Sequence, residues 1–364
     1  MYEEFLEELR KKYNYTEDLI NAIRICIPVM ISTYGDEKKV LDLFNNIRIF
    51  ITKSATKETI DTLEKEVAGK INSHVVFTDN NMYGVKQDPP ACYSYREVYD
   101  EDMNIIGEAR WIMLKDAEYN KEDYMSLFGT PINIPYFLHE LNHAYGMQNV
   151  VYYKRENKFV IKHGMQITES EFKKNKNTKK YIETLSVDND IILEEIIAEL
   201  NTQRQLVILM NKKDYNEVKK VLGAINHVPT LYNDSLMLIG EELEKEIGES
   251  RLRDYRENND FSVVDEFNST CRKSNISEKY INKEYAWEYL SHKCYDIFQL
   301  SVDKYKMSTD EYGQKQLQLI ADAFAAIHAY KEAKYGTSSL EKYEELLDKT
   351  IGYRQRIMRG WYYG

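Results

Sequence analysis

The sequence is poor in cysteine, and it has no long apolar run. Its cysteines are Cys26, Cys92, Cys271 and Cys294, which lie far apart with no C-x-x-C spacing; this argues against a cysteine zinc knot or a redox pair. No apolar segment approaches the roughly 18 residues that span a bilayer. The first residues, MYEEFLEELRKKYNYTEDL, carry acidic groups where a secretory signal has a basic and then an apolar region. We therefore expect a cytoplasmic protein.

Basic residues are also fewer than acidic residues. The chain has 49 Lys and Arg against 60 Asp and Glu, a formal net charge of -11, which repels phosphate backbones and anionic membrane surfaces. The lysines between 173 and 180 are clustered, but they lie in an Asn-rich stretch that is typical of a solvated turn. We expect no nucleic-acid partner and no membrane partner.

The apolar pattern changes along the chain. Helical periodicity predicts helices at 16–34, 36–46 and 57–71, and β-branched or alternating runs predict strands at 47–52, 74–79, 93–99 and 109–115. The last two strands are expected to form a hairpin through the DEDMN turn. From Leu193 onward helical patterns prevail, and two capping boxes, Ser308 with Glu311 and Ser338 with Glu341, mark helix starts. An α+β fold follows, with a mixed β-sheet lobe at residues 1–150 and a mostly helical lobe at residues 151–364.

One segment at the end of the first lobe carries a pattern of metal-binding residue types. NIPYFLHELNHAYGM contains His139 and His143 four residues apart, so on a helix both imidazoles project from one face, as two ligands of a tetrahedral zinc ion must. Glu140 lies about 100° round the helix from His139, close enough to serve as a general base for a water on the metal. The apolar residues of the segment fall on the opposite arc.

A third ligand must come from elsewhere. In the metzincin pattern it is a histidine six residues after the second one, but that position is Asn149 here. The later segment IILEEIIAELNTQRQL offers Glu194, Glu195 and Glu199 instead.

A helical wheel separates the three acids. Glu194 falls on the face of Asn201 and Gln205, which looks solvated, whereas Glu195 and Glu199 border the apolar arc. We predict Glu195 as the ligand and keep Glu199 and Glu194 as alternatives; Glu199 could also orient a ligand histidine.

HELNH followed by E-I-I-A-E resembles the gluzincin metallopeptidases, particularly the branch of lethal-factor-type and Pro-Pro-endopeptidase-type enzymes. The resemblance is specific at these two helices and covers residues 47–205 in layout. It implies a zincin-like fold, Zn²⁺ as cofactor, and a peptide or protein substrate. It also implies the reaction, in which Glu140 activates a zinc-bound water that hydrolyses a peptide bond.

The residue that would stabilise the oxyanion departs from the family pattern. Lethal-factor-type enzymes use a tyrosine a few residues before the ligand glutamate, but the matching position here is Asp188. Tyr181 is the nearest upstream tyrosine, and His163 in the strand-like FVIKHGMQI is a second candidate. Tyr152 and Tyr153 are further alternatives.

Two hypotheses concern what the protein acts on. Zincins generally lay a peptide along an exposed edge strand, so 109–115 could bind substrate in this way, although its apolar residues on both sides also suit a strand inside the sheet. The alternative to an enzyme is a catalytically silent zincin-like module that binds or regulates another protein. The intact Glu140 favours the enzyme.

Overall fold

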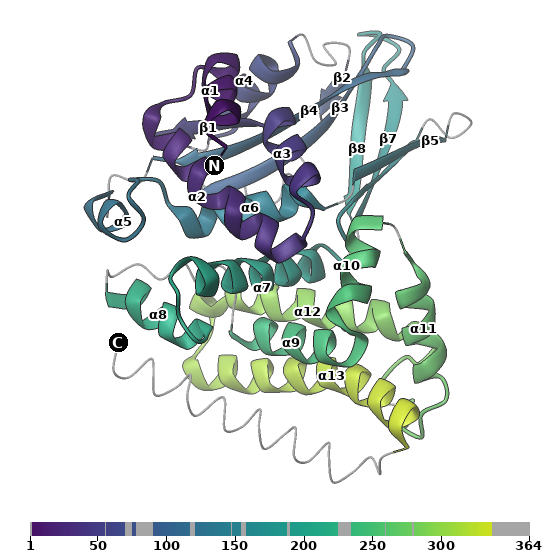
Figure 1. Cartoon of the computed structure of the whole chain (residues 1–364). Coiled ribbons are helices and arrows are strands. Elements are labelled where there is room, and N and C mark those ends of the chain that lie inside the picture. The colour runs from purple at the N-terminus through teal and green to yellow at the C-terminus, as the bar shows by residue number, and fades with distance from the viewer. Residues whose placement is uncertain are drawn as a thin grey trace. The chain divides into compact units, whose positions relative to one another are not determined.

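The computed structural model describes residues 2–54, 56–69, 75–77, 90–116, 121–146, 148–153, 158–187, 190–224, 234–258, 260–278 and 280–336. The helices are α1 (Glu3–Tyr13), α2 (Glu17–Tyr34), α3 (Glu37–Asn46), α4 (Lys57–Ala68), α5 (Lys121–Phe128), α6 (Ile134–Tyr145), α7 (Ile191–Leu209), α8 (Tyr215–Ala224), α9 (Asp234–Ile247), α10 (Glu249–Asn258), α11 (Ser262–Cys271), α12 (Ala286–Val302), η2 (Lys304–Lys306) and α13 (Thr309–Tyr335) (Figure 1). The strands are β1 (Arg48–Thr52), β2 (Val75–Phe77), β3 (Ala91–Tyr99), β4 (Ile105–Lys115), β5 (Gln148–Tyr153), β6 (Lys158–His163), β7 (Gln166–Lys174) and β8 (Tyr181–Val187).

The chain folds into two compact units that alternate along the sequence. Unit one comprises Met1–Ile161, Thr168–Ser186 and Asn201–Pro229, and unit two comprises Lys162–Ile167, Val187–Leu200 and Thr230–Gly364. Unit one thus includes segments that follow the boundary expected at residue 150. Helix α7 is continuous from Ile191 to Leu209 and contributes to both units.

A three-stranded sheet with the order β1-β4-β3 forms the centre of unit one. Strand β4 pairs in parallel with β1 and in antiparallel with β3, which confirms the predicted hairpin. One face of β4 packs on the core formed with α1, α2, α3 and α6, and its other face, with Trp111 and Met113, packs against Ile60 and Leu63 of α4.

Of the two interpretations of 109–115, the structure confirms the strand inside the sheet and contradicts the exposed edge strand. Both hydrogen-bonding sides of β4 are occupied by neighbouring strands. The physical reason is visible in the residues, because a strand that is apolar on both faces is stable only where both faces are covered. Here Ile112 and Leu114 fill one layer while Trp111 and Met113 fill the other.

A second sheet has five strands in the order β2-β8-β7-β6-β5. Strands β5 to β8 follow α6 in the chain, whereas β2 precedes it and pairs in parallel with β8. Strands β6 and β7 are joined by a tight turn at Gly164 and Met165. The segment 159–167, which reads as one strand-like run, therefore reverses direction at its middle. Gly164 permits the reversal because it adopts a φ of +59°, a conformation that glycine reaches without steric cost.

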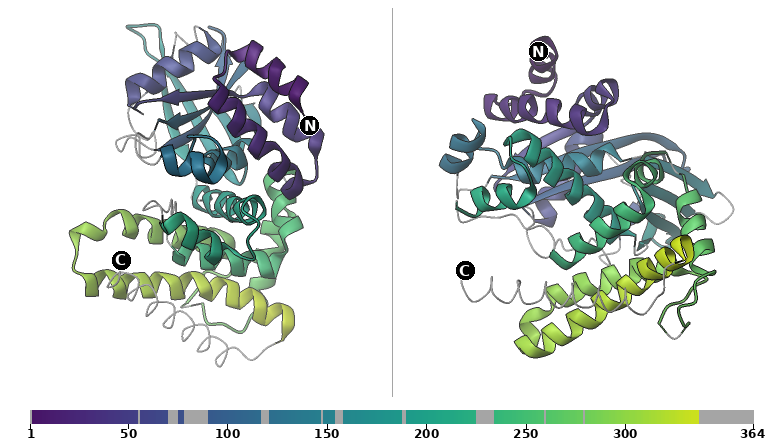
Figure 2. Two further views of the ribbon diagram at one scale, coloured as in Figure 1. Left: turned by 60° about the vertical axis from the view of Figure 1, so that its left-hand side comes forward. Right: turned by 60° about the horizontal axis from the view of Figure 1, so that its bottom comes forward.

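The described part of unit two after residue 233 is helical, as the sequence predicts. Helices α9 to α13 enclose a core that includes Phe267, Trp287 and Tyr330, and α12 packs against α13 (Figure 2). The hydroxyl of Ser308 accepts a hydrogen bond from the Glu311 amide at the start of α13, which confirms that cap. The second predicted cap, Ser338 with Glu341, lies outside the described residues. Among the described helices, none combines the length and apolar character that crossing a bilayer requires.

Candidate metal centre

Helix α6 carries the HELNH residues, and local sequence fixes where it begins. The Asn133 side chain accepts a hydrogen bond from the Tyr136 amide at 3.1 Å, and Pro135 occupies the first turn, where a missing N–H costs nothing. The helix ends at Gly146. The histidine face is buried as deeply as the apolar back, since His139, Glu140 and His143 expose 2%, 8% and 6% of their surface.

The two imidazoles point their Nε2 atoms at one another. These nitrogens are 3.0 Å apart, and the rings are inclined by 81°. A zinc ion bound tetrahedrally at about 2.0–2.1 Å would hold two imidazole nitrogens roughly 3.3 Å apart. The observed separation is therefore close to the spacing that a shared ion requires.

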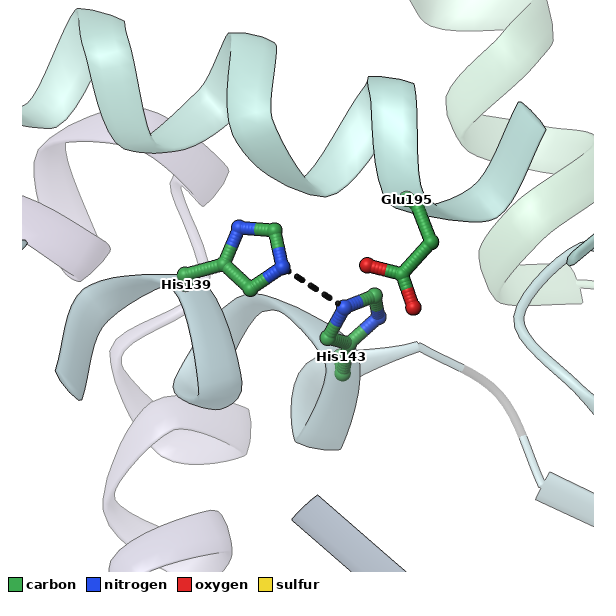
Figure 3. A group of neighbouring side chains, drawn as sticks. All are labelled: His139, His143 and Glu195. Atoms are coloured by element: carbon green, nitrogen blue, oxygen red, sulfur yellow. Dashed lines mark hydrogen bonds between the residues drawn. The ribbon is translucent and has the colours of Figure 1, made fainter. Parts of the chain in front are cut away.

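Glu195, in the second turn of α7, completes the group. One ligand atom from each of His139, His143 and Glu195 lies within 4.8 Å of the other two. Figure 3 shows the Glu195 carboxylate directed toward the two rings. Two imidazoles and one carboxylate form a donor set that suits zinc and leaves one of four coordination positions for another molecule. The residues present thus fit the ion that the sequence predicts.

Glu194 is in a different situation, and the interpretation of its face as solvated is wrong. Its side chain is fully buried and paired with Arg256, with Nη2 to Oε1 at 2.7 Å and Nε to both carboxylate oxygens at 3.0 Å. Asn201 and Gln205 on the same face expose only 7% and 0%. The helical wheel gave a wrong prediction of exposure because a polar face can be buried when every polar group on it has a hydrogen-bonding partner.

Glu199, the other alternative ligand, is also buried, but it is not among the three residues that converge. Its predicted role in orienting a ligand histidine stays a prediction.

The start of α7 is anchored by Asp190. Its carboxylate accepts hydrogen bonds from the Trp287 indole at 3.0 Å and the Tyr255 hydroxyl at 3.2 Å, and its backbone oxygen accepts from the Glu194 amide. Burial raises the pKa of Asp190 despite these donors. The first turn of α7 is therefore held by side chains of α10 and α12, which fixes the helix just before Glu195.

The candidate oxyanion residues have separate surroundings. Tyr181 is the first residue of β8 and packs with the aromatic cluster of Tyr99, Phe159 and Phe172. His163 ends β6, directly before the turn in which the Met165 amide donates to the Glu194 carboxylate at 3.0 Å. Through this bond, the loop that follows His163 contacts the first turn of α7. Tyr181 begins β8, whereas it is the other end of β8 that leads into α7. The side chains of Tyr152 and Tyr153, and all of Asp188, lie outside the described residues.

Sequence reasoning missed three residues that shape this region: Asn142, Gly164 and Arg256. Asn142 had a signal, because a polar residue between two ligand histidines on a buried helix must find partners. Gly164 had one too, as a glycine inside an alternating run that often marks a turn. Arg256 had none, because its partner Glu194 is 62 positions away in the chain.

Comparisons with protein-family models, curated proteins and solved structures find no match to this chain.

Proposed function

We propose that the chain is a zinc-dependent peptidase of the gluzincin type with a zincin-like α+β fold. The convergence of His139, His143 and Glu195 on one point carries this proposal. The mixed helices and sheets of the described structure are compatible with such a fold. The substrate would be a peptide or a protein.

A zinc ion in this site would supply a Lewis acid that lowers the pKa of a water molecule and polarises the scissile carbonyl. The roles of the surrounding side chains follow from their positions. Glu140 lies on α6 beside His139 and, being only 8% exposed, is shielded from bulk solvent. It would accept the proton of the attacking water and later pass it to the leaving amine.

His163 is the better candidate for stabilising the oxyanion. Its backbone is tied to α7 through the Gly164–Met165 turn and Glu194, so its position is coupled to that of Glu195. Tyr181 instead supplies its ring to an aromatic cluster. An imidazole N–H directed at the developing charge would act where electrostatic stabilisation is worth most, in a site shielded from water.

The experiment compares the wild-type protein with Glu140→Gln in zinc content and in cleavage of a peptide library. We expect equal zinc content and a loss of at least about 100-fold in cleavage rate for the variant, because removal of a general base costs about that much or more. Cleavage by both proteins at the same negligible rate, with zinc bound to both, would contradict the proposal and favour a catalytically silent module.

A further inference from the structure

Asn142 and Gln205 form a reciprocal pair of carboxamides that joins α6 to α7 within unit one. The Asn142 Nδ2 donates to the Gln205 Oε1 at 3.0 Å, and the Gln205 Nε2 donates to the Asn142 Oδ1 at 2.9 Å. Both residues have no exposed surface. Two parallel hydrogen bonds between planar groups fix the orientation as well as the distance of the partners.

The remaining hydrogen-bonding capacity of Asn142 is also used. Its Nδ2 donates a second time, to the Thr202 hydroxyl at 2.9 Å, and its Oδ1 accepts from the Tyr34 hydroxyl at 2.8 Å. A carboxamide has two donor hydrogens and two acceptor lone pairs, so the Asn142 side chain is saturated. The Tyr34 hydroxyl in turn accepts from Asn201 of α7 at 3.3 Å.

These contacts specify how α7 lies along α6. Thr202 and Gln205 belong to the half of α7 that packs in unit one, and a shift of α7 by one residue would move it by about 1.5 Å and rotate its faces by about 100°. The donors and acceptors would then no longer meet. An apolar seam would tolerate such a shift far better, and a single buried asparagine is known to fix the register of coiled coils for this reason.

The same contacts act on the metal centre through two rigid helices. Asn142 follows His139 by three positions, which places it about 60° round α6 from His139 and about 100° from His143. Thr202 follows Glu195 by seven positions, which places both on nearly the same face of α7. Because α7 is rigid, the hydrogen bond between Thr202 and Asn142 therefore determines the position of the Glu195 carboxylate along α6.

We propose that Asn142 and Gln205 are positioning residues that set the register of α7 so that Glu195 reaches the ion held by His139 and His143. Because the metal centre is itself proposed, the role of the pair depends on that proposed function. The proposed role of the pair is geometric, since the net contribution of a buried hydrogen bond to stability is only about 1 kcal/mol.

The test is a zinc dissociation constant measured by competition with a chelator, for the wild type and for the double variant Asn142→Leu with Gln205→Met. We expect zinc binding about 10–100-fold weaker, the range typical for residues that orient ligands. We expect the metal-free double variant to stay folded with a lowered unfolding midpoint, because the Tyr34 and Thr202 hydroxyls lose their bonds to Asn142. Tyr124→Phe is the matched control, because it removes the bond from Asn133 to the Tyr124 hydroxyl at the other end of α6 and should leave the zinc affinity unchanged.

If the double variant Asn142→Leu with Gln205→Met does not fold, a second set of variants tests the same inference. The exchanged pair Asn142→Gln with Gln205→Asn keeps the combined side-chain length, so it should bind zinc more tightly than either single substitution. The inference is overturned if the exchanged pair is no better than the worse single variant, or if a folded apolar pair keeps the wild-type affinity. A wild-type protein that binds no zinc would refute the metal centre itself, whereas tight wild-type binding with an unchanged apolar pair refutes only the role of Asn142 and Gln205.

Discussion

Arg256→Met should destabilise the protein strongly, because it leaves the Glu194 carboxylate buried with its cationic partner removed. The two side chains are 1% and 2% exposed and share three close contacts of 2.7–3.0 Å. Removing one partner of a buried ion pair costs about 3–5 kcal/mol. Methionine approximates the length of the arginine stem, so the loss reports charge more than volume.

The matched control is Arg253→Met on the same helix. Arg253 pairs with Glu249 at 2.5 Å, but the two side chains are 32% and 48% exposed, and a pair of this kind contributes about 0.3–0.5 kcal/mol. Urea unfolding of the metal-free proteins, followed by helical circular dichroism, gives both free energies. A cost for Arg256→Met no larger than that for Arg253→Met would refute this reasoning. Adding Glu194→Gln to Arg256→Met should recover much of the loss, since the glutamine oxygen can still accept from the Met165 amide.

Two further changes test the surroundings of Glu195. Gly164→Ala should lower the free energy of unfolding by about 2–4 kcal/mol, because φ is +59° and a Cβ would overlap the Glu194 carboxylate. Gly129→Ala is the control: its φ is +74° but its Cβ would meet open space, so the loss should be only about 1 kcal/mol. Equal losses for the two variants would contradict the predicted overlap at Gly164. Asp190→Asn should change how stability depends on pH. Burial raises the pKa of Asp190, so the wild type is favoured while the group is protonated and loses stability as pH rises from its ordinary value of about 4 through the raised one. The melting temperature of Asp190→Asn relative to wild type should therefore increase over that range, and a constant difference would contradict the prediction.

Local patterns were sufficient to predict much of the fold. The strands at 47–52, 93–99 and 109–115 follow from β-branched and alternating residues, and the α6 helix follows from its apolar arc. For strand β4 the sequence left both a central and an edge position open, because neighbours in a sheet are chosen by long-range packing. Its apolar residues on both faces indicated a central position, and the family analogy argued for an edge.

The residues of the candidate site also differ in how far local sequence patterns could predict them. His139, Glu140 and His143 could be predicted because their spacing alone places them together on one helix. Glu195 required a comparison of three acids on a second helix, and the comparison misjudged Glu194. Burial of Glu194 depends on Arg256, which no periodicity connects to it, since an ion pair 62 residues apart in the chain is created only by tertiary packing.

The most direct measurement is the zinc content of the dialysed protein, taken in parallel for wild type, Glu195→Gln and Glu199→Gln. The convergence of two imidazoles with the Glu195 carboxylate predicts one zinc per chain in the wild type, retention in Glu199→Gln, and loss in Glu195→Gln. Retention in Glu195→Gln together with loss in Glu199→Gln, or no zinc in the wild type, would contradict the account.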